Sequence, residues 1–439
     1  MLGAGKGKDE VFAALSEARG RDADWRHGRT FSLVYFAGDE SLEVIRHAYG
    51  SFIHENGLSM DAFPSLRRFE REAIRDACAL FGGASCGSMT SGGTESVLMA
   101  MKAARDWGRA KLAGGDASRV LNVIAPTTVH PAFDKAAHTL VMRLVKVPVG
   151  ADFKADVAAM VAAVDAHTVM LVGTAFTFPH GVVDDVVGLA SAARSRGILC
   201  HVDACLGGFV LAFAGEAGGE AVDFDFRVPG VTSLSADLHK YGYAAKGASL
   251  VLYRDRALRK CQFFATVDWP GGLYGSPTMA GTRPGGAIAA AWAIQQYLGH
   301  DGYVRLAREV LLAAARLRDG IAATPGLRLL GDPRHSVLSF TGDGLDVFAV
   351  DERMKKLGWH LDRLQAPSAV QMIVSAAHPG VVGAFLADLR RVTAEVRDGG
   401  LQAEADGAIY GALVSMPDRE YVGELVLGWM DGHDHDDVG

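Results

Sequence analysis

The 439-residue chain lacks the features that would place it in a membrane, in an export pathway or on nucleic acid. No uninterrupted apolar stretch approaches the roughly 20 residues of a membrane-spanning helix. The N-terminal run Met1 to Lys6 has no apolar signal-peptide core. Basic residues form no run, and 44 Lys and Arg against 51 Asp and Glu give a net charge of −7. We therefore expect a soluble, cytoplasmic protein with no transmembrane segment and no nucleic-acid partner.

Cysteine is also scarce, because the chain has five, scattered along its length, and none forms a metal-type pair at short spacing. Reduced, buried thiols are the simplest interpretation. His and Asp gather in the final segment, Gly432 to Asp437, where a solvated tail is a simpler interpretation than a weak metal site. No metal site is predicted.

What the chain does contain is a regular alternation of apolar runs and amphipathic stretches. A composition of 49% hydrophobic and 22% charged residues is typical of a soluble enzyme, and the length favours two lobes. The expected strands are 120–125, 141–147, 169–173, 198–202 and 248–253, and the expected helices are 97–107, 131–139, 154–165 and 184–196. This pattern predicts an α/β fold whose mostly parallel sheet is covered on both faces, with a site at one sheet edge.

The C-terminal part predicts a second, smaller α+β domain. One long helix over 299–323 leads into it. The expected strands there are 326–330, 336–340 and 370–374, and the expected helices are 346–357 and 381–397. The predicted organisation is an N-terminal segment at 1–60, a large domain at 61–298 and a small domain at 299–439.

Lys240 is the first candidate for chemistry, because it lies between an apolar segment at 231–234 and the strand at 248–253. Burial of an ammonium is costly, so we expect a lowered pKa and a nucleophilic amine. Such an amine can bond covalently to the aldehyde of a cofactor such as pyridoxal phosphate. Taken alone, a solvated loop lysine is the simpler interpretation.

Three other segments strengthen this interpretation. Gly93 and Thr94 lie in a Gly-rich turn before a helix, which can bind a phosphate or simply cap the helix. Asp203 ends an apolar strand, where it can hold a pyridine nitrogen protonated or cap the next helix. His130 follows a strand and a short loop, where it can stack on a flat ring or be an ordinary loop histidine.

Longer strings resemble the sphingosine-1-phosphate lyase family of pyridoxal-phosphate enzymes, as a bacterial form without the membrane anchor of eukaryotic members. The resemblance runs from about Tyr35 to the segment at Tyr410. The strings are HVDACLGGF from His201, DFDFRV from Asp223, ADLHKYGYAAKG from Ala236, DWPGGLY from Asp268, GTRPGG from Gly281 and GAIYG from Gly407. It implies a fold-type I, group II decarboxylase-like large domain and a lyase that cleaves a phosphorylated long-chain amino alcohol.

The resemblance also implies roles for single residues. Lys240 would hold the cofactor. Its phosphate would lie on Gly93 and Thr94, assisted by His239 and by Thr282 of a second subunit. The expected assembly is therefore a homodimer with shared active sites.

Asp203 and His130 would contact the cofactor ring. Tyr35 and Tyr410 match family active-site tyrosines, although core or interface positions explain them equally well. Lys246 matches a lysine that contacts the substrate phosphate.

Substrate binding is also expected at the segment from Asn56 to Pro64, where this chain departs from the family pattern. The family commonly has a histidine at the position of Ser59. Loss of that donor would weaken phosphate binding by roughly 1.5–3 kcal/mol, unless His54 compensates. A decarboxylase or aldolase with the same cofactor therefore stays an alternative. A protein of this fold without catalysis is the third hypothesis, although Lys240 and Asp203 are both present.

Overall fold

A seven-stranded sheet forms the centre of the larger lobe in this computed structural model, which describes residues 3–111 and 119–433. The strand order is β1-β7-β6-β5-β4-β2-β3, and β7 runs antiparallel to both of its neighbours while the other pairs are parallel. The strands are β1 (Cys86–Thr90), β2 (Asn122–Pro126), β3 (Arg143–Val147), β4 (Thr168–Thr174), β5 (Leu199–Asp203), β6 (Ser233–Ala236) and β7 (Ser249–Tyr253). The predicted α/β class with a mostly parallel sheet is confirmed.

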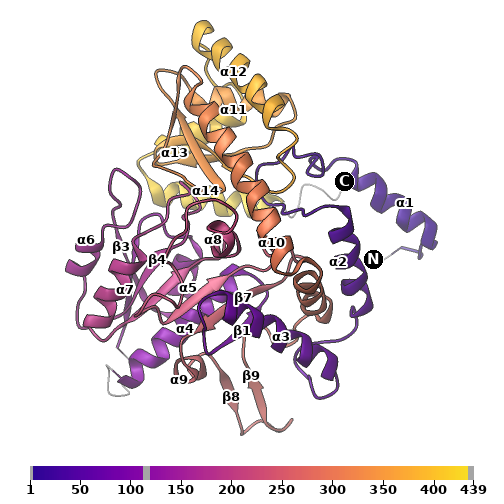
Figure 1. Cartoon of the computed structure of the whole chain (residues 1–439), viewed down its shortest axis with the longest axis vertical. Helices are drawn as coiled ribbons and strands as arrows, with labels where there is room; N and C mark the ends of the chain where they lie inside the picture. The colour runs from indigo at the N-terminus through magenta and orange to yellow at the C-terminus, as the bar shows by residue number, and fades with distance from the viewer. Residues whose placement is uncertain (1–2, 112–118, 434–439) are drawn as a thin grey trace.

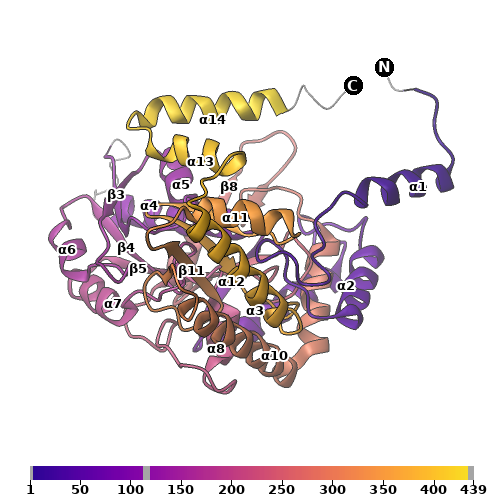
Figure 2. The ribbon, with the colours of Figure 1, turned by 90° about the horizontal axis from the view of Figure 1, so that it is seen from above.

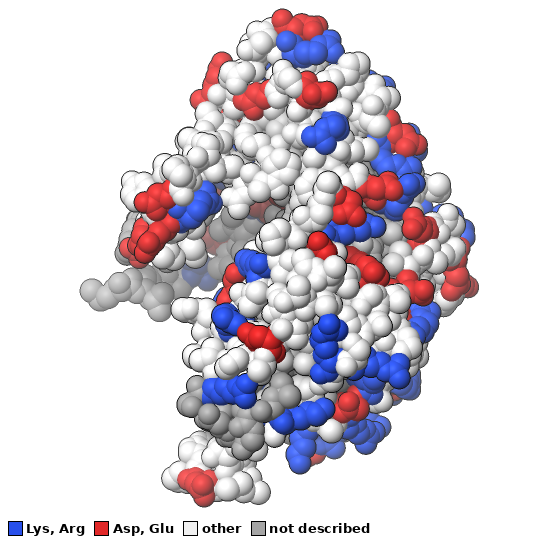
Figure 3. Space-filling model, turned by 90° about the vertical axis from the view of Figure 1, so that its left-hand side faces the viewer, with Lys and Arg blue, Asp and Glu red and all other residues white. Residues whose placement is uncertain are grey.

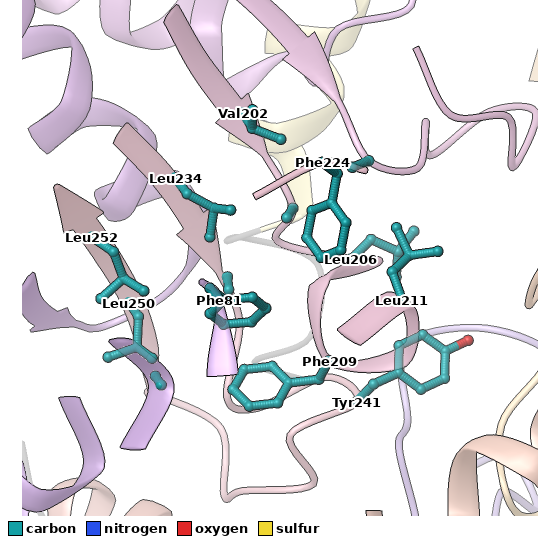
Figure 4. Packing of buried hydrophobic residues seen from close by; sticks show 14 of the residues in the cluster. Phe81, Val202, Leu206, Phe209, Leu211, Phe224, Leu234, Tyr241, Leu250 and Leu252 are labelled. Atoms are coloured by element: carbon teal, nitrogen blue, oxygen red, sulfur yellow. The ribbon is translucent and has the colours of Figure 1, made fainter. Parts of the chain in front are cut away.

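Helices cover both faces of this sheet (Figure 1). They are α3 (Pro64–Leu80), α4 (Gly93–Lys111), α5 (Ala132–Leu140), α6 (Val157–Ala162), α7 (Val186–Ser195), α8 (Gly208–Ala214) and α9 (Arg256–Lys260). Strand alternation sends Leu250 and Leu252 into the core shared with α3, α7 and α8, and sends Val251 and Tyr253 into the core shared with α4 and α5. Figure 4 shows Leu250 and Leu252 on the side of Phe81, whose ring meets Phe209 edge to face.

The smaller lobe is built on a four-stranded antiparallel sheet in the order β10-β11-β13-β12. Its elements are β10 (Leu327–Leu329), β11 (Val337–Gly342), α11 (Val347–Lys356), β12 (Asp362–Gln365), β13 (Ser368–Ile373), α12 (Val382–Gly399), α13 (Asp406–Ser415) and α14 (Arg419–His433). Its core also contains Phe31 from the N-terminal segment, whose carbonyl accepts a hydrogen bond from the Ile373 N–H.

The two lobes are joined by α10 (Gly285–Ala322), which bends at Gly299. Gly299 has φ 55° and ψ −172°, a conformation that a side chain disfavours. The predicted helix over 299–323 is therefore the second half of a longer helix. Its first half, which sequence periodicity did not reveal, packs on α2 (Asp39–Ser51).

Several short or peripheral elements were also not predicted. They are α1 (Lys8–Arg19), α2, α3, α8, α9, β1, β12, α13, α14 and the hairpin of β8 (Phe264–Thr266) and β9 (Tyr274–Ser276). Figure 2 shows α1 projecting from the body and α14 running along the edge of the molecule beyond α13. Strands β8, β9 and β12 escape detection because three or four residues give little periodicity, and β1 (CGSMT) lacks a continuous apolar run.

The surface carries both charge signs. Figure 3 shows acidic and basic side chains intermingled over the upper lobe and basic ones gathered toward the lower one. Within 3–111 and 119–433, no helix combines the length and hydropathy needed to cross a membrane. The His/Asp-rich segment of the sequence lies mostly outside the described residues, from 434 onward.

Candidate active site

A cavity of about 400 Å³ lies where several strands of the large sheet end. Thr174 and Asp203 end β4 and β5, and further lining residues follow β1, β2 and β6. This is the edge at which open α/β sheets bind ligands. Six of the predicted site residues line this cavity: Gly93, Thr94, His130, Asp203, His239 and Lys240.

The Gly-rich turn enters the cavity at the first residues of α4. Glu95 fixes this turn, because its Oε2 accepts the Ser91 N–H at 2.7 Å. Its Oε1 accepts the N–H groups of Met279 and Ala280 at 2.8 and 3.2 Å, which ties the loop before α10 to the same turn. The free N–H groups and positive dipole end of α4 suit an anion here.

Asp203 is almost completely buried at the end of β5. Its Oδ1 accepts hydrogen bonds from the Cys205 N–H at 3.0 Å and the Ser235 hydroxyl at 3.2 Å. Ser235 also lies 3.2 Å from Nε2 of His201. Burial lowers the pKa of His201 to about 4, so this imidazole is neutral at physiological pH and the carboxylate keeps a site for another donor.

His130 is held in a fixed orientation at the opposite wall. Its Nδ1 accepts the Ala132 N–H at 3.1 Å, which leaves Nε2 protonated in the neutral ring. Its ring meets that of Phe178 edge to face, with centroids 6.3 Å apart. The Phe178 carbonyl accepts a hydrogen bond of 2.5 Å from the buried side-chain amide of Gln371, on β13 of the smaller lobe.

Lys240 corrects one expectation from the sequence. Its Nζ lies 2.9 Å from Oδ2 of Asp237, a carboxylate that is almost entirely buried. Burial alone lowers the pKa of the ammonium, but the Asp237 charge outweighs burial and raises it. The expected lowered pKa is therefore wrong for this state, because sequence reasoning included the desolvation and not the counter-ion.

Asp237 is itself tied into a chain of buried hydroxyls. Its Oδ1 accepts the Ser249 hydroxyl at 2.6 Å, and Ser249 lies 2.8 Å from Ser96. Although burial opposes ionisation, Lys240 and His239 hold the pKa of Asp237 well below its usual range. The pair is thus a fixed ion pair in the wall of the cavity.

Lys246 and Tyr35 lie together beside this pair. The Lys246 ammonium is 5.2 Å from the centre of the Tyr35 ring and donates to the Leu33 carbonyl at 2.8 Å. Partial burial and then the charge of Lys240 lower the pKa of Lys246 to about 8. Burial raises the pKa of Tyr35, although Lys240 opposes the shift, so its hydroxyl stays protonated.

Six predicted residues do not line the cavity within this chain: Tyr35 and Lys246, described above, and four others. Tyr410 packs edge to face on Phe348 in the smaller lobe and donates to the Arg363 carbonyl at 3.2 Å. Asn56 accepts the N–H groups of Leu58 and Ser59 at 3.1 and 3.2 Å. Ser59 is exposed.

Thr282, the fourth, is exposed on the loop before α10. Its neighbour Arg283 is buried against Glu70 in an ion pair. This ion pair gives Arg283 a structural role.

Sequence reasoning assigned no role to four residues that shape the site: Asp237, Glu95, Phe178 and Gln371. Asp237 stands three positions before Lys240 in a string that was recognised, and this spacing was the available signal. Gln371 contacts the cavity wall from another lobe, so no local pattern reveals it.

The residues of the cavity fit pyridoxal phosphate. A Cβ at Gly93 would lie 2.9 Å from the carboxylate of Asp237 and from Sγ of Cys205, so only glycine lets the turn approach this closely. Thr174 lines the cavity, and its buried hydroxyl has no hydrogen-bond partner among the described residues. A lysine, a strand-end carboxylate and a helix N-terminus match the aldehyde, pyridine nitrogen and phosphate of this cofactor.

Comparisons with known proteins agree with this geometry. Residues 25–342 match the pyridoxal-dependent decarboxylase conserved domain. The chain is 42% identical over 438 residues to a sphingosine-1-phosphate lyase of Arabidopsis thaliana, covering 96% of this chain and 79% of that protein. The chain belongs to the sphingosine-1-phosphate lyase family.

Solved structures support the same assignment. A sphingosine-1-phosphate lyase of Burkholderia pseudomallei superimposes with a TM-score of 0.86 at 37% identity, covering 91% of this chain and 93% of that one. A glutamate decarboxylase of Lactobacillus brevis shares the fold, with a TM-score of 0.80 at 19% identity and coverage of 90% and 94%. As a sphingosine-1-phosphate lyase family member with the pyridoxal-dependent domain, the protein is a pyridoxal-phosphate-dependent enzyme, as the sequence predicted.

Proposed function

We propose that this enzyme cleaves a carbon–carbon bond in sphingosine 1-phosphate or a similar phosphorylated long-chain amino alcohol. The products are a fatty aldehyde and phosphoethanolamine. One observation carries the proposal: Lys240, Asp203, His130 and the α4 turn converge on one cavity in a chain 42% identical to a sphingosine-1-phosphate lyase.

Each cavity residue has a definite task. Pyridoxal phosphate, when bound, supplies a ring that accepts the electron pair of the breaking bond. Lys240 would hold it covalently, with Gly93, Thr94 and His239 at its phosphate. Asp203 would accept a hydrogen bond from the pyridine nitrogen, and His130 would stack on the ring; both line the cavity.

Recognition of the substrate phosphate is assigned to Lys246, with Asn56 and Ser59 on the neighbouring loop. The Lys246 ammonium is charged below its pKa of about 8 and can pair with a phosphate. Because Ser59 supplies no positive charge, Lys246 contributes a larger share of the binding free energy for the substrate phosphate.

Tyr35 and Tyr410 are assigned a hydrogen bond to the oxygen of the C3 hydroxyl, whose proton must pass to a separate base. Tyr35 lies nearer to the proposed chemistry than Tyr410. Its ring contacts Tyr241 edge to face, and the Lys246 ammonium lies over it, beside the Lys240–Asp237 pair. Tyr410 is half-buried in the smaller lobe, and burial raises its pKa. Both hydroxyls are therefore protonated at rest and are suited to donate a hydrogen bond.

We further propose a homodimer in which Thr282 serves the neighbouring cavity. Thr282 is exposed, whereas the loop that carries it is anchored to the phosphate turn through Glu95. Mixing Lys240→Ala chains with Thr282→Glu chains should regenerate activity, because one site of each mixed dimer keeps both native residues. Absence of recovery in dimers shown to be mixed would contradict shared sites.

We also propose a cytoplasmic location. The five cysteines are free, and four of them are buried, as expected where thiols stay reduced. Fractionation of the producing cells tests this, and recovery of the activity outside the cytoplasmic fraction would contradict it.

The decisive assay is incubation of the purified holoenzyme with sphingosine 1-phosphate and detection of the aldehyde and phosphoethanolamine. Lys240→Ala should abolish both products. The control is Lys356→Ala, which replaces an exposed lysine of the smaller lobe. Absence of aldehyde from the wild-type holoenzyme would overturn the proposal.

A pyridoxal-phosphate-dependent amino-acid decarboxylase or aldolase is the second candidate, because Ser59 replaces a phosphate-binding histidine. Carbon dioxide released from amino acids without aldehyde formation from the lipid would favour the decarboxylase.

A further inference from the structure

A second and larger hollow, of about 1,070 Å³, lies between α3 and α9. Seven cationic side chains and one carboxylate line it, and we name it the arginine groove. Its cations are Arg67, Arg68, Arg71, Arg75, Arg256, Arg259 and Lys260. None of its lining residues lines the cofactor cavity.

The cations stand on two facing walls. Arg67, Arg71 and Arg75 recur every fourth residue, which places them on one side of α3. The opposite wall is α9, whose cations are separated from those of α3 by the neutral segment at 83–87.

Only part of this charge is neutralised. Arg67, Arg68 and Arg75 form ion pairs with Asp61, Glu72 and Asp76. The other four cations of the groove pair with no carboxylate within the described ranges.

The side chains of three of those four, Arg71, Arg256 and Lys260, make no hydrogen bond or ion pair with any described residue. The fourth, Arg259, contacts the Ser88 hydroxyl and the ring of Phe263. Four positive charges therefore face one hollow in a protein of net charge −7.

The cations of the groove repel one another unless a bound anion neutralises them. Like charges one helical turn apart, and across a groove, repel one another. Guanidinium groups present paired N–H donors that match the oxygens of a phosphate. Four cations without a carboxylate partner exceed the charge of a single phosphate, so the groove suits an anion with several phosphate groups.

We propose that the arginine groove is a binding site for phosphate-bearing polyanions, separate from the active site. Two sources present this chemistry: a soluble compound with adjoining phosphates, or the clustered headgroups of an acidic phospholipid surface. The four cations without a carboxylate partner are the groups that recognise it.

The test measures binding to the holoenzyme, whose cofactor site is already filled. The groove variant carries Arg71→Gln, Arg256→Gln and Lys260→Gln. The matched control carries Arg328→Gln, Lys356→Gln and Arg390→Gln, the same charge change at exposed residues of the smaller lobe. Absorbance of the bound cofactor checks that each variant is folded.

Inorganic pyrophosphate, followed by calorimetry, is the soluble probe, and co-sedimentation with phosphatidylglycerol-containing vesicles is the lipid probe. We expect at least one probe to bind the wild type and the control alike and to bind the groove variant about tenfold or more weakly. Pyrophosphate binding identifies a soluble source, and binding to vesicles alone identifies a lipid source.

Binding of neither probe, or equal binding by the groove variant, would overturn the proposal. So would binding that survives in the groove variant and disappears in Lys246→Gln, because that result locates the anion in the active site. None of these readouts uses turnover, so they are independent of the proposed reaction.

Discussion

Nζ of Lys240 lies 2.9 Å from Oδ2 of Asp237, and the two side chains form a largely buried ion pair in the wall of the cofactor cavity. Asp237 keeps the amine protonated and fixes its position between β6 and β7. The position and the protonation state of the Lys240 amine are therefore set by its counter-ion, Asp237, rather than by desolvation.

Asp237→Asn should lower the pKa of Lys240, because burial remains and the compensating charge is gone. Removal of one partner of a buried pair should also reduce the free energy of unfolding by about 3 kcal/mol. Urea unfolding at neutral pH measures this loss. The control Asp39→Asn breaks an exposed pair with Arg26 and should cost less than about 1 kcal/mol.

The acid limb of the stability curve provides a second check on Asp237. The pKa of Asp237 is lower in the folded state than in the unfolded state. Its ionised form therefore stabilises the folded protein at pH values above the unfolded-state pKa, and this stabilisation is lost as the pH falls through the folded-state pKa. Wild type should lose this stability below about pH 4, whereas Asp237→Asn should lack this part of the decline. Equal acid limbs would contradict the ion pair.

His201 should make folding sensitive to mild acid. Burial depresses its folded pKa to about 4, so its contribution is complete above the unfolded value of about 6.5 and is lost as the pH falls toward 4. The integrated effect is roughly 3 kcal/mol. His201→Gln should flatten this part of the stability curve, measured by urea unfolding between pH 7.5 and pH 4.5, whereas His47→Gln, at an exposed position on α2, should leave it unchanged.

Lys246 should set the alkaline limit of substrate binding. Above its pKa of about 8 the ammonium loses its charge, so KM for the phosphorylated substrate should rise about tenfold per pH unit. Lys246→Arg should shift this rise to higher pH, because arginine stays charged. The non-phosphorylated amino alcohol is the control, and an identical pH profile for both substrates would refute the assignment.

Ser59→His should strengthen binding of the phosphorylated substrate. A charge-assisted hydrogen bond contributes about 1.5–3 kcal/mol, so KM should fall by about tenfold or more with little change in kcat. Steady-state kinetics at pH 6, where the histidine is charged, provide the measurement. His54→Gln is the companion variant, and a rise of KM there would show that His54 compensates for Ser59.

Gln371→Leu should weaken cofactor binding, although Gln371 lies in the smaller lobe and the cavity lies in the larger one. The Phe178 carbonyl would lose its donor, which costs about 1–3 kcal/mol when the group stays buried, and the wall that carries His130 would loosen. The dissociation constant of the cofactor should rise and its visible circular dichroism should weaken. Gln402→Leu, at an exposed position, is the control; unchanged cofactor spectra in Gln371→Leu would remove Gln371 from this role.

Much of the cavity was predictable because its residues stand at the ends of strands. Asp203 follows a run of buried apolar residues, and this pattern places a carboxylate at the ligand-binding edge of a parallel sheet. Gly93 and Thr94 precede a long amphipathic helix, so their place at its N-terminus also followed from the pattern. The family strings then identified Lys240 among the lysines.

What the sequence could not reveal depends on contacts between distant or irregular segments. The direction of the Lys240 pKa depends on whether Asp237 points toward it, and a spacing of three residues in a loop does not determine this. Gln371 reaches Phe178 through the packing of the two lobes. Glu95 holds the loop at 279–280 through backbone donors, which carry no side-chain signature.

The two carboxylate oxygens of Glu95 bind different segments. One accepts a hydrogen bond from the Gly-rich turn of its own cavity, and the other accepts hydrogen bonds from the loop that carries Thr282. In the homodimer that we propose, the loop that carries Thr282 would reach the neighbouring cavity, so this carboxylate would be in contact with the machinery of both active sites. Filling one centre would then be felt in the other, and the paired chains would work as a coupled unit rather than as two independent catalysts.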